Sequence, residues 1–350
     1  MTNLIENIEE ERFNNNDEEF NLKKFTKKLK ELSENYEDYL SGKKTLKMNN
    51  NEVKYFGTQM YECAIIQPKK ETQEIKPNKS SIIGSIVGYL NNILSLRIEN
   101  SSDDSERNYN INLPDLFPKL KSLEIFQCDL NDFYDLHKFI PKLTHLTLDS
   151  CKMKNFKDVF LDGSLTNKIK SFTCTHNFIN FFDESLKSLQ EIENLDLHSN
   201  KITEITGMNY INIKNLNTLN LSFNQISSVS QIYMFLGYIK ELNLSGNRLT
   251  STKGLTKLYS LEKLDISENK ITSIKEITAL RKIPNLFDLK IALNPCTKRE
   301  EHRAQTFLVL KSLIYLDNKT ISKKEQEETE NGRAKKNEAK TKGNGKNEAK

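Results

Sequence analysis

LNTLNLSFNQI, residues 216–226, and IKELNLSGNRL, residues 239–249, are two copies of one pattern that decides the fold of this chain. Both copies carry apolar residues at positions 1, 4, 6 and 11 and an Asn at position 9. The pattern occurs eight times at intervals of 22 to 26 residues, with Cys replacing Asn in two copies. The copies start at Leu120, Leu143, Ile169, Ile192, Leu216, Ile239, Leu261 and Leu286, and a degenerate ninth copy starts at Ile93. Such regular recurrence predicts a repeat protein.

The apolar spacing predicts one short strand in each copy. Alternate residues of a strand face opposite sides, so positions 4 and 6 enter the core together with position 1, whereas positions 3 and 5 face outward. Position 9 turns the chain off the sheet, where a buried Asn satisfies backbone groups that the turn leaves unpaired. We therefore expect a ladder of buried side chains made of Cys128, Cys151, Asn177, Asn200, Asn224, Asn247, Asn269 and Asn294.

The residues after position 9 return the chain to the next strand. After Asn269, apolar residues recur every three residues from Ile271 to Ile283, a spacing that suits a short helix or a 3-10 turn. The predicted fold is an α/β solenoid with a curved parallel sheet on its concave side and short helices or 3-10 turns on its convex side. We expect about eight or nine repeats, with a cap at each end.

These residues resemble the leucine-rich repeat family. The short period and the apolar return segment are similar to the subfamily typified by a regulatory subunit of protein phosphatase 1. Residues 280–317 are also similar to a ciliary radial-spoke leucine-rich-repeat protein, and the whole resemblance covers residues 93–325. The C-terminal cap of the subfamily is matched at Asn294, Pro295, Arg303, Phe307, Leu310, Leu313, Leu316 and Asp317, with His302 and Lys311 in place of the usual Tyr and Pro.

The flanks of the repeats differ from them in composition. Apolar residues at helical spacing predict an amphipathic helix over about 17–40. Two roles remain open for this helix, because it could cover the first coil of the solenoid or dock a partner. The expected divisions are an acidic disordered N-terminus (1–16), an amphipathic helix with an N-terminal flank or cap (17–80), the repeats (81–296), the C-terminal cap (297–325) and a basic low-complexity tail (326–350).

Charge and cysteine content restrict the compartment and the partner. The chain of 350 residues has a net charge of +4, but residues 331–350 contain seven Lys or Arg and two Glu, so the basic character belongs to the tail. Five scattered Cys do not form a disulfide framework. The N-terminus lacks the features of a secretory signal, and no apolar stretch is long enough to span a bilayer. We expect an intracellular, cytoplasmic monomer without a transmembrane segment, with the cilium or the nucleus as alternative locations.

No catalytic motif is present in the sequence. It contains no GxxxxGK[ST], GxSxG, HExxH or CxxC pattern. Cys128 and Cys151 are interpreted as inert members of the ladder. His145, Asp149, His176 and His198 are expected near one another on the concave side, but they lack the rigid spacing of metal ligands. We therefore expect no catalytic residue, no metal and no cofactor.

The concave face is the most informative predicted surface. Positions 3, 5, 7 and 8 of the eight copies supply seven acids and two bases, which favours a basic protein partner and disfavours direct contact with phosphates. Phe126 and Phe223 are candidate anchors, although residues there could instead pack on the next coil. The predicted partner-binding residues are Glu124, Phe126, Thr147, Asp149, Asp196, His198, Asn220, Phe223, Glu241, Asn243, Asp265, Glu268, Asp288 and Lys290.

The sequence favours a non-enzymatic scaffold that binds one protein partner. The resemblance implies either regulation of a phosphatase catalytic subunit or assembly of a ciliary complex. The alternative is a nucleic-acid-associated ribonucleoprotein subunit, because the cap also resembles that of a spliceosomal leucine-rich-repeat subunit and the tail is basic. The acidic concave face argues against direct nucleic-acid contact in that alternative.

Overall fold

The structure of the chain is a computed structural model. It describes residues 27–28, 30–54, 57, 88–100, 113–133, 136–161, 167–210, 213–299, 301–327, 329 and 331. The predicted disordered N-terminus, the start of the predicted helix, Cys63 and nearly all of the basic tail lie outside these residues. The chain divides into two compact units. Unit 1 comprises residues 1–177 and 187–191, and unit 2 comprises residues 178–186 and 192–350.

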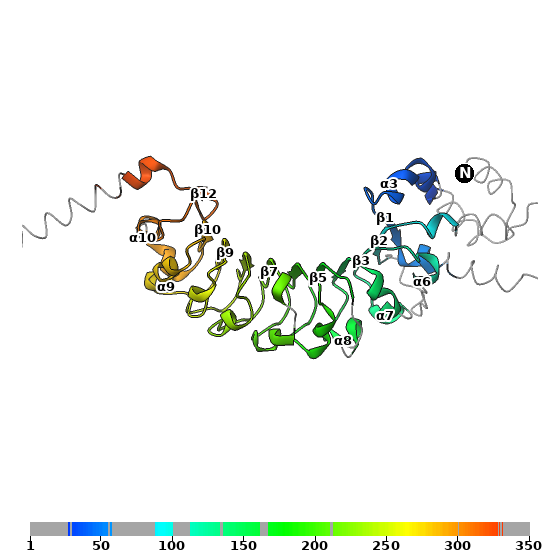
Figure 1. Ribbon diagram of the computed structural model, residues 1–350, viewed down its shortest axis with the longest axis horizontal. Helices are drawn as coiled ribbons and strands as arrows, with labels where there is room; N and C mark the ends of the chain where they lie inside the picture. Colours follow the sequence, from blue (N-terminus) through cyan, green and yellow to red (C-terminus); the bar gives the residue numbers. More distant parts are fainter. Residues whose placement is uncertain are drawn as a thin grey trace, which may run out of the picture. The chain divides into compact units, whose positions relative to one another are not determined.

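The described residues of unit 1 form five parallel strands in chain order. They are β1 (Leu46–Asn49), β2 (Ser95–Glu99), β3 (Ser122–Phe126), β4 (His145–Asp149) and β5 (Ser171–Thr175). The strands lie side by side, and the short helices α6, α7 and α8 lie on the other side of their coils (Figure 1). The helical segments are α3 (Tyr36–Leu40), α6 (Leu113–Leu116), η1 (Leu130–Asp132), α7 (Leu136–Phe139), η2 (Ile140–Lys142) and α8 (Lys157–Phe160).

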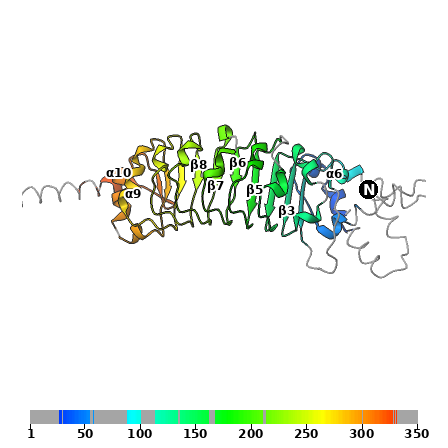
Figure 2. The ribbon, with the colours of Figure 1, turned by 90° about the horizontal axis from the view of Figure 1, so that it is seen from below.

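Unit 2 continues the same one-strand-per-coil organisation. Its parallel strands are β6 (Asn194–Asp196), β7 (Thr218–Asn220), β8 (Glu241–Asn243), β9 (Lys263–Asp265), β10 (Asp288–Lys290) and β11 (Tyr315–Leu316), and β12 (Lys319–Thr320) pairs antiparallel with β11. Figure 2 shows β6, β7 and β8 side by side. The return segments contain η4 (Thr206–Tyr210), η5 (Ile213–Asn215), η6 (Ile232–Met234), η7 (Leu255–Lys257), α9 (Ile274–Ala279), η8 (Leu280–Lys282), η9 (Pro295–Lys298) and α10 (His302–Val309), and η3 (Glu184–Ser188) has residues in both units.

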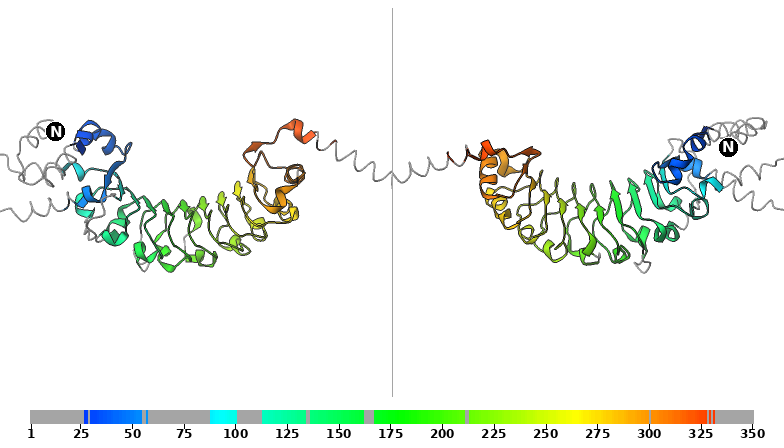
Figure 3. Two further views of the ribbon diagram at one scale, coloured as in Figure 1. Left: turned by 180° about the vertical axis from the view of Figure 1, so that it is seen from behind. Right: turned by 45° about the horizontal axis from the view of Figure 1, so that its top comes forward.

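The core follows the apolar repeat. Positions 1, 4 and 6 are buried in all eight copies. The position-4 residues pair in register along each unit, for example Leu219 with Leu195 and with Leu242. The coils of each unit can be followed strand by strand in both views of Figure 3. The predicted α/β solenoid is therefore confirmed, and its core was readable from local spacing because each coil repeats the same inward positions.

Position 8 has a left-handed backbone in every copy. Its φ angle lies between 52° and 65° in Gln127, Ser150, His176, Ser199, Phe223, Gly246, Glu268 and Leu293. The N–H of this residue donates to the carbonyl of position 7 in the next coil at Gln127, Ser150, Ser199, Phe223, Gly246 and Glu268, as in the 2.8 Å bond from Phe223 to Ser245. A left-handed conformation costs a non-Gly residue about 1–2 kcal/mol, which these inter-coil bonds help to offset.

The structure adds a coil that the sequence pattern missed. Leu46 and Met48 of β1 pair with Leu96 and Ile98 of β2, so β1 occupies positions 4 to 7 of a further coil. Position 1 of that coil is the exposed Lys43, and the apolar template therefore does not match it. The degenerate copy that starts at Ile93 forms β2. The divisions of the chain proposed from composition stay a prediction.

Candidate binding surface

The outward side chains of each strand layer form the candidate site. Strands β7 to β10 share one pattern, in which a buried residue stands between two half-buried ones. We call the side chains at positions 3, 5, 7 and 8 the strand face of each unit. The predicted binding residues divide between the two faces, with Glu124, Phe126, Thr147 and Asp149 in unit 1 and Asp196, His198, Asn220, Phe223, Glu241, Asn243, Asp265, Glu268, Asp288 and Lys290 in unit 2.

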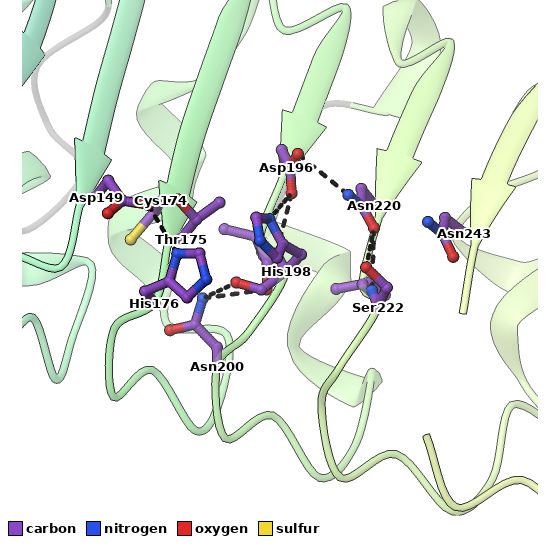
Figure 4. Close-up of polar contacts among 12 residues, drawn as sticks. Asp149, Cys174, Thr175, His176, Asp196, His198, Asn200, Asn220, Ser222 and Asn243 are labelled. Carbon is purple, nitrogen blue, oxygen red and sulfur yellow. Dashed lines mark hydrogen bonds and ion pairs between the residues drawn. The ribbon is translucent and has the colours of Figure 1, made fainter. Parts of the chain in front are cut away.

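Position 5 of strands β6 to β9 closes the turn that follows each of these strands. Oδ1 of Asp196, Asn220, Asn243 and Asp265 accepts the backbone N–H two residues later, at 3.0 to 3.1 Å. Asn220 Nδ2 also donates to Asp196 Oδ2 at 3.1 Å (Figure 4). Asp and Asn side chains commonly bond the backbone in this way, and both residue types perform the task here. These carboxylates are therefore part of the scaffold as well as part of the surface.

Ion pairs link neighbouring strands on the same face. Lys263 Nζ lies 2.8 Å from Glu241 Oε1, and Lys290 Nζ lies 3.8 Å from Asp265 Oδ2. The hydrogen bond from Lys263 to Glu241 is the main cause that raises the pKa of the lysine. Oδ1 of Asp288 is buried and has no hydrogen-bond partner among the described residues. With five acids and two bases, the strand face of unit 2 keeps a negative excess despite these pairs.

Phe223 is a strongly exposed aromatic residue of the unit 2 face. Its side chain is 51% exposed, and its ring lies over the backbone of Gly246 in the next coil. A Cβ on Gly246 would lie only 2.6 Å from Phe223 Cδ1, so glycine is required there for steric reasons as well as for its positive φ. Phe223 thus packs on the next coil with part of its ring and leaves about half of its surface accessible.

Phe126 on the strand face of unit 1 is covered by a cation. The guanidinium carbon of Arg97 lies 3.8 Å from the centre of the Phe126 ring, and Arg97 also pairs with Glu99 at 2.6 Å and Glu124 at 3.7 Å. Arg97 and Lys47 are not among the binding residues predicted from the sequence, although Arg97 stands at position 5 of the degenerate copy. These two bases reduce the acidic excess of the unit 1 face.

Asp149 is the centre of a polar cluster on the unit 1 face (Figure 4). Its Oδ2 accepts the Thr175 hydroxyl at 2.5 Å and lies 2.8 Å from His176 Nδ1, while its Oδ1 accepts the Ser150 hydroxyl at 2.8 Å. Burial raises the pKa of Asp149, but these three hydrogen bonds outweigh it, and the pKa lies below its usual value. Thr147 is half-buried between Glu124 and Thr173 on the neighbouring strands.

The position-9 side chains bond backbone groups of successive coils. Asn247 Nδ2 donates to the carbonyls of Leu221, Leu244 and Ser245, and its Oδ1 accepts the N–H of Ile226 at 3.0 Å. The other five ladder Asn also donate from Nδ2 to backbone carbonyls and accept a backbone N–H of the preceding coil at Oδ1. They are Asn177, Asn200, Asn224, Asn269 and Asn294.

The two cysteines at position 9 bond the same kind of backbone group. Cys151 Sγ donates to the carbonyls of Ile125 and Asp149, and Cys128 Sγ donates to that of Phe126. Burial raises the pKa of both thiols to about 12, which suppresses the reactive thiolate.

The described residues contain neither a metal-binding cluster nor a membrane-spanning helix. It holds no group of three or more His, Cys, Asp or Glu side chains arranged to bind a metal ion. Those same residues include no helix with the length and apolar character needed to cross a membrane.

Comparison with known proteins gives partial matches that share one description. A family model described as "Leucine-rich repeat" matches residues 173–343. An uncharacterized leucine-rich repeat-containing protein of Schizosaccharomyces pombe is 35% identical over 144 residues, which are 41% of this chain and 23% of that protein. Leucine-rich repeat-containing protein 23 of Bos taurus is 27% identical over 137 residues, which are 39% of this chain and 33% of that protein. The chain thus aligns with a third or less of the length of these relatives.

Solved structures are similar in fold. The TLR13–ssRNA13 complex matches with a TM-score of 0.50 and 21% identity over 67% of this chain and 33% of that chain. An internalin of Listeria monocytogenes matches with a TM-score of 0.44 and 18% identity over 67% of this chain and 70% of that chain. The repeated coils and the position-9 side chains that bond them agree with the sequence matches. Residues 173–343 match the leucine-rich repeat family, and the described coils have the fold of a leucine-rich-repeat solenoid.

Proposed function

We propose that this chain is a non-enzymatic scaffold and that the strand face of unit 2 binds a protein partner with a basic surface. The leucine-rich repeat fold in general mediates protein–protein interaction, and the proposal applies that role to a defined surface. The observation that carries it is the combination of five acids against two bases with the half-exposed Phe223 on one hydrogen-bonded strand layer. Charge of this kind sets encounter rate and partner choice, and an aromatic anchor supplies affinity.

The sequence resemblance suggests two classes of partner, and we include both in the proposal. A phosphatase catalytic subunit and a ciliary complex both remain candidates, and neither is named by the matched relatives. An intracellular, cytoplasmic location and a monomeric state are also part of the proposal, and the scattered cysteines support the intracellular location. A ribonucleoprotein role for this face is disfavoured, because phosphate contacts require Lys and Arg rather than an acidic excess.

The structure provides a variant that changes charge without disturbing the turns. Asn already stands at position 5 in β7 and β8, so Asp196→Asn and Asp265→Asn keep the Oδ1 acceptor and remove one negative charge each. Combined with Glu241→Gln, they form the neutralised variant. Its matched control neutralises three acids of unit 2 that lie outside the strand face, with Glu204→Gln, Glu262→Gln and Glu327→Gln.

The test compares the partner captured from native extract by each variant and then measures association with the purified partner. The neutralised variant should associate roughly tenfold more slowly at low salt, with a weaker salt dependence, and the control should match the original chain. Asn220→Asp with Asn243→Asp should have the opposite effect. Unchanged association of the neutralised variant, together with loss of binding when residues 326–350 are removed, would show that the tail is the binding element.

A further inference from the structure

Three return segments of unit 2, each taken as far as position 2 of the next coil, differ in charge from its strand face. Residues 229–240, 251–262 and 272–287, which belong to three consecutive coils, contain six Lys or Arg and two Glu. The six bases are all exposed, and they are Lys240, Lys253, Lys257, Lys275, Arg281 and Lys282. Packing of η7 against both η6 and η8 holds these three segments together. We call this surface the return-side patch.

The two acids of the return-side patch are already engaged. Glu276 Oε2 accepts the Ser251 hydroxyl and the Thr252 N–H, each at 2.7 Å, and these bonds together with one from the Thr252 hydroxyl lower its pKa although burial opposes the shift. Glu262 lies 3.5 Å from Lys240 Nζ. Lys253, Arg281 and Lys282 form no ion pair within the described part of the chain. The patch therefore presents an uncompensated positive charge.

The same three segments carry large side chains with high exposure. Tyr238 is 69% exposed, Tyr259 is 59% exposed and Met234 is 64% exposed. Tyr238 and Tyr259 precede the buried position-1 residues of two consecutive coils, Ile239 and Leu261, so the backbone that carries them is anchored in the core. Lys257 Nζ lies 3.9 Å from the ring centre of Tyr233, which shows that a cation and an aromatic ring of neighbouring coils already meet here.

We propose that the return-side patch binds single-stranded nucleic acid, with the bases stacked on Tyr238 and Tyr259 and the phosphates held by the surrounding Lys and Arg. Sequence-tolerant proteins of this kind combine a basic track with exposed aromatic rings. An acidic peptide would satisfy the lysines but would gain little from the rings, because the face of an aromatic ring carries negative potential and does not attract carboxylates. The site is independent of the strand face proposed to bind protein.

The experiment uses the full-length chain and fluorescein-labelled 20-nucleotide oligomers of uridine and of deoxythymidine, with binding followed by fluorescence anisotropy. Tyr238→Ala and Tyr259→Ala should each weaken binding roughly fivefold to a hundredfold, and Tyr238→Phe with Tyr259→Phe should restore it, because phenylalanine stacks without the hydroxyl. Lys253→Ala with Lys282→Ala should lower the slope of log K against log salt by about 0.7 for each phosphate that the variant no longer neutralises.

All variants retain the basic C-terminal tail, so its contribution to binding is constant across the series. Equal affinity of the original chain and the Tyr→Ala variants would overturn the proposal and assign binding to the tail. The proposal is also overturned if a 20-residue polyglutamate peptide displaces the oligonucleotide and the binding of that peptide requires the two tyrosines. The ligand of the patch would then be an acidic protein. A preference for uridine over deoxythymidine oligomers, or the reverse, distinguishes RNA from DNA as the ligand.

Discussion

Asn224→Ala tests the ladder that bonds one coil to the next. Asn224 Nδ2 donates to the carbonyls of Leu197 at 3.0 Å, Leu221 at 3.1 Å and Ser222 at 3.1 Å, and its Oδ1 accepts the N–H of Ile202 at 2.9 Å. The side chain is 6% exposed, so water cannot readily replace it. Alanine removes all four bonds and adds no polar atom.

The four backbone groups are not affected equally. The carbonyls of Leu197 and Leu221 keep bonds from Asn200 Nδ2 and Asn247 Nδ2, and the carbonyl of Ser222 keeps the N–H of Ser199. The Ile202 N–H loses its acceptor inside the coil. An unsatisfied buried donor costs about 1–3 kcal/mol. Because each of the three carbonyls also loses one hydrogen bond, we expect a loss of stability of about 2–3 kcal/mol.

Denaturant unfolding followed by circular dichroism measures the loss of stability. Hydrogen exchange at the Ile202 amide gives a local measure that does not depend on two-state unfolding of a repeat array. The control is Cys128→Ala, which removes one weak 3.3 Å bond from Sγ to the Phe126 carbonyl and should cost less. A smaller loss for Asn224→Ala than for Cys128→Ala, or unchanged exchange at Ile202, would refute the assignment of the ladder.

Three further predictions follow from individual side chains. Folding lowers the pKa of Asp149, so its carboxylate stabilises the fold at pH values above the pKa of the unfolded chain. That contribution is lost as the pH falls through the lowered pKa of the folded chain. Lowering the pH below about 4 should therefore reduce the stability of the original chain more than that of Asp149→Asn, as measured by urea unfolding at each pH. Gly246→Ala should cost about 1–2 kcal/mol in thermal or urea unfolding, and less in a Phe223→Ala background, where the 2.6 Å overlap is removed. Cys128 and Cys151, with pKa values raised to about 12, should resist iodoacetamide at pH 8 in the folded chain and react after unfolding, as measured by mass spectrometry.

The inward half of each coil could be read from the sequence. Positions 1, 4 and 6 are set by the period of two along a strand and by the return of the chain at a constant interval, so the burial of Leu216, Leu219 and Leu221 follows from local spacing. The same logic failed at β1, because the exposed Lys43 stands where the template requires an apolar residue at position 1.

The outward half of each coil depended on the tertiary structure. From the sequence, Asp265 is predicted to be an exposed charge. In the structure it accepts the turn N–H of Ser267 and pairs with Lys290, which lies 25 residues away in the chain. The two predicted aromatic anchors also differ in exposure. The Arg97 guanidinium covers the ring of Phe126, whereas Phe223 packs beside Gly246 and stays about half exposed. The tyrosines of the return-side patch also carry no periodic signal, because they stand in segments of variable length. Apolar periodicity is a property of one coil, but the pairing and exposure of polar and aromatic side chains depend on which residues the register brings beside them from the next coil.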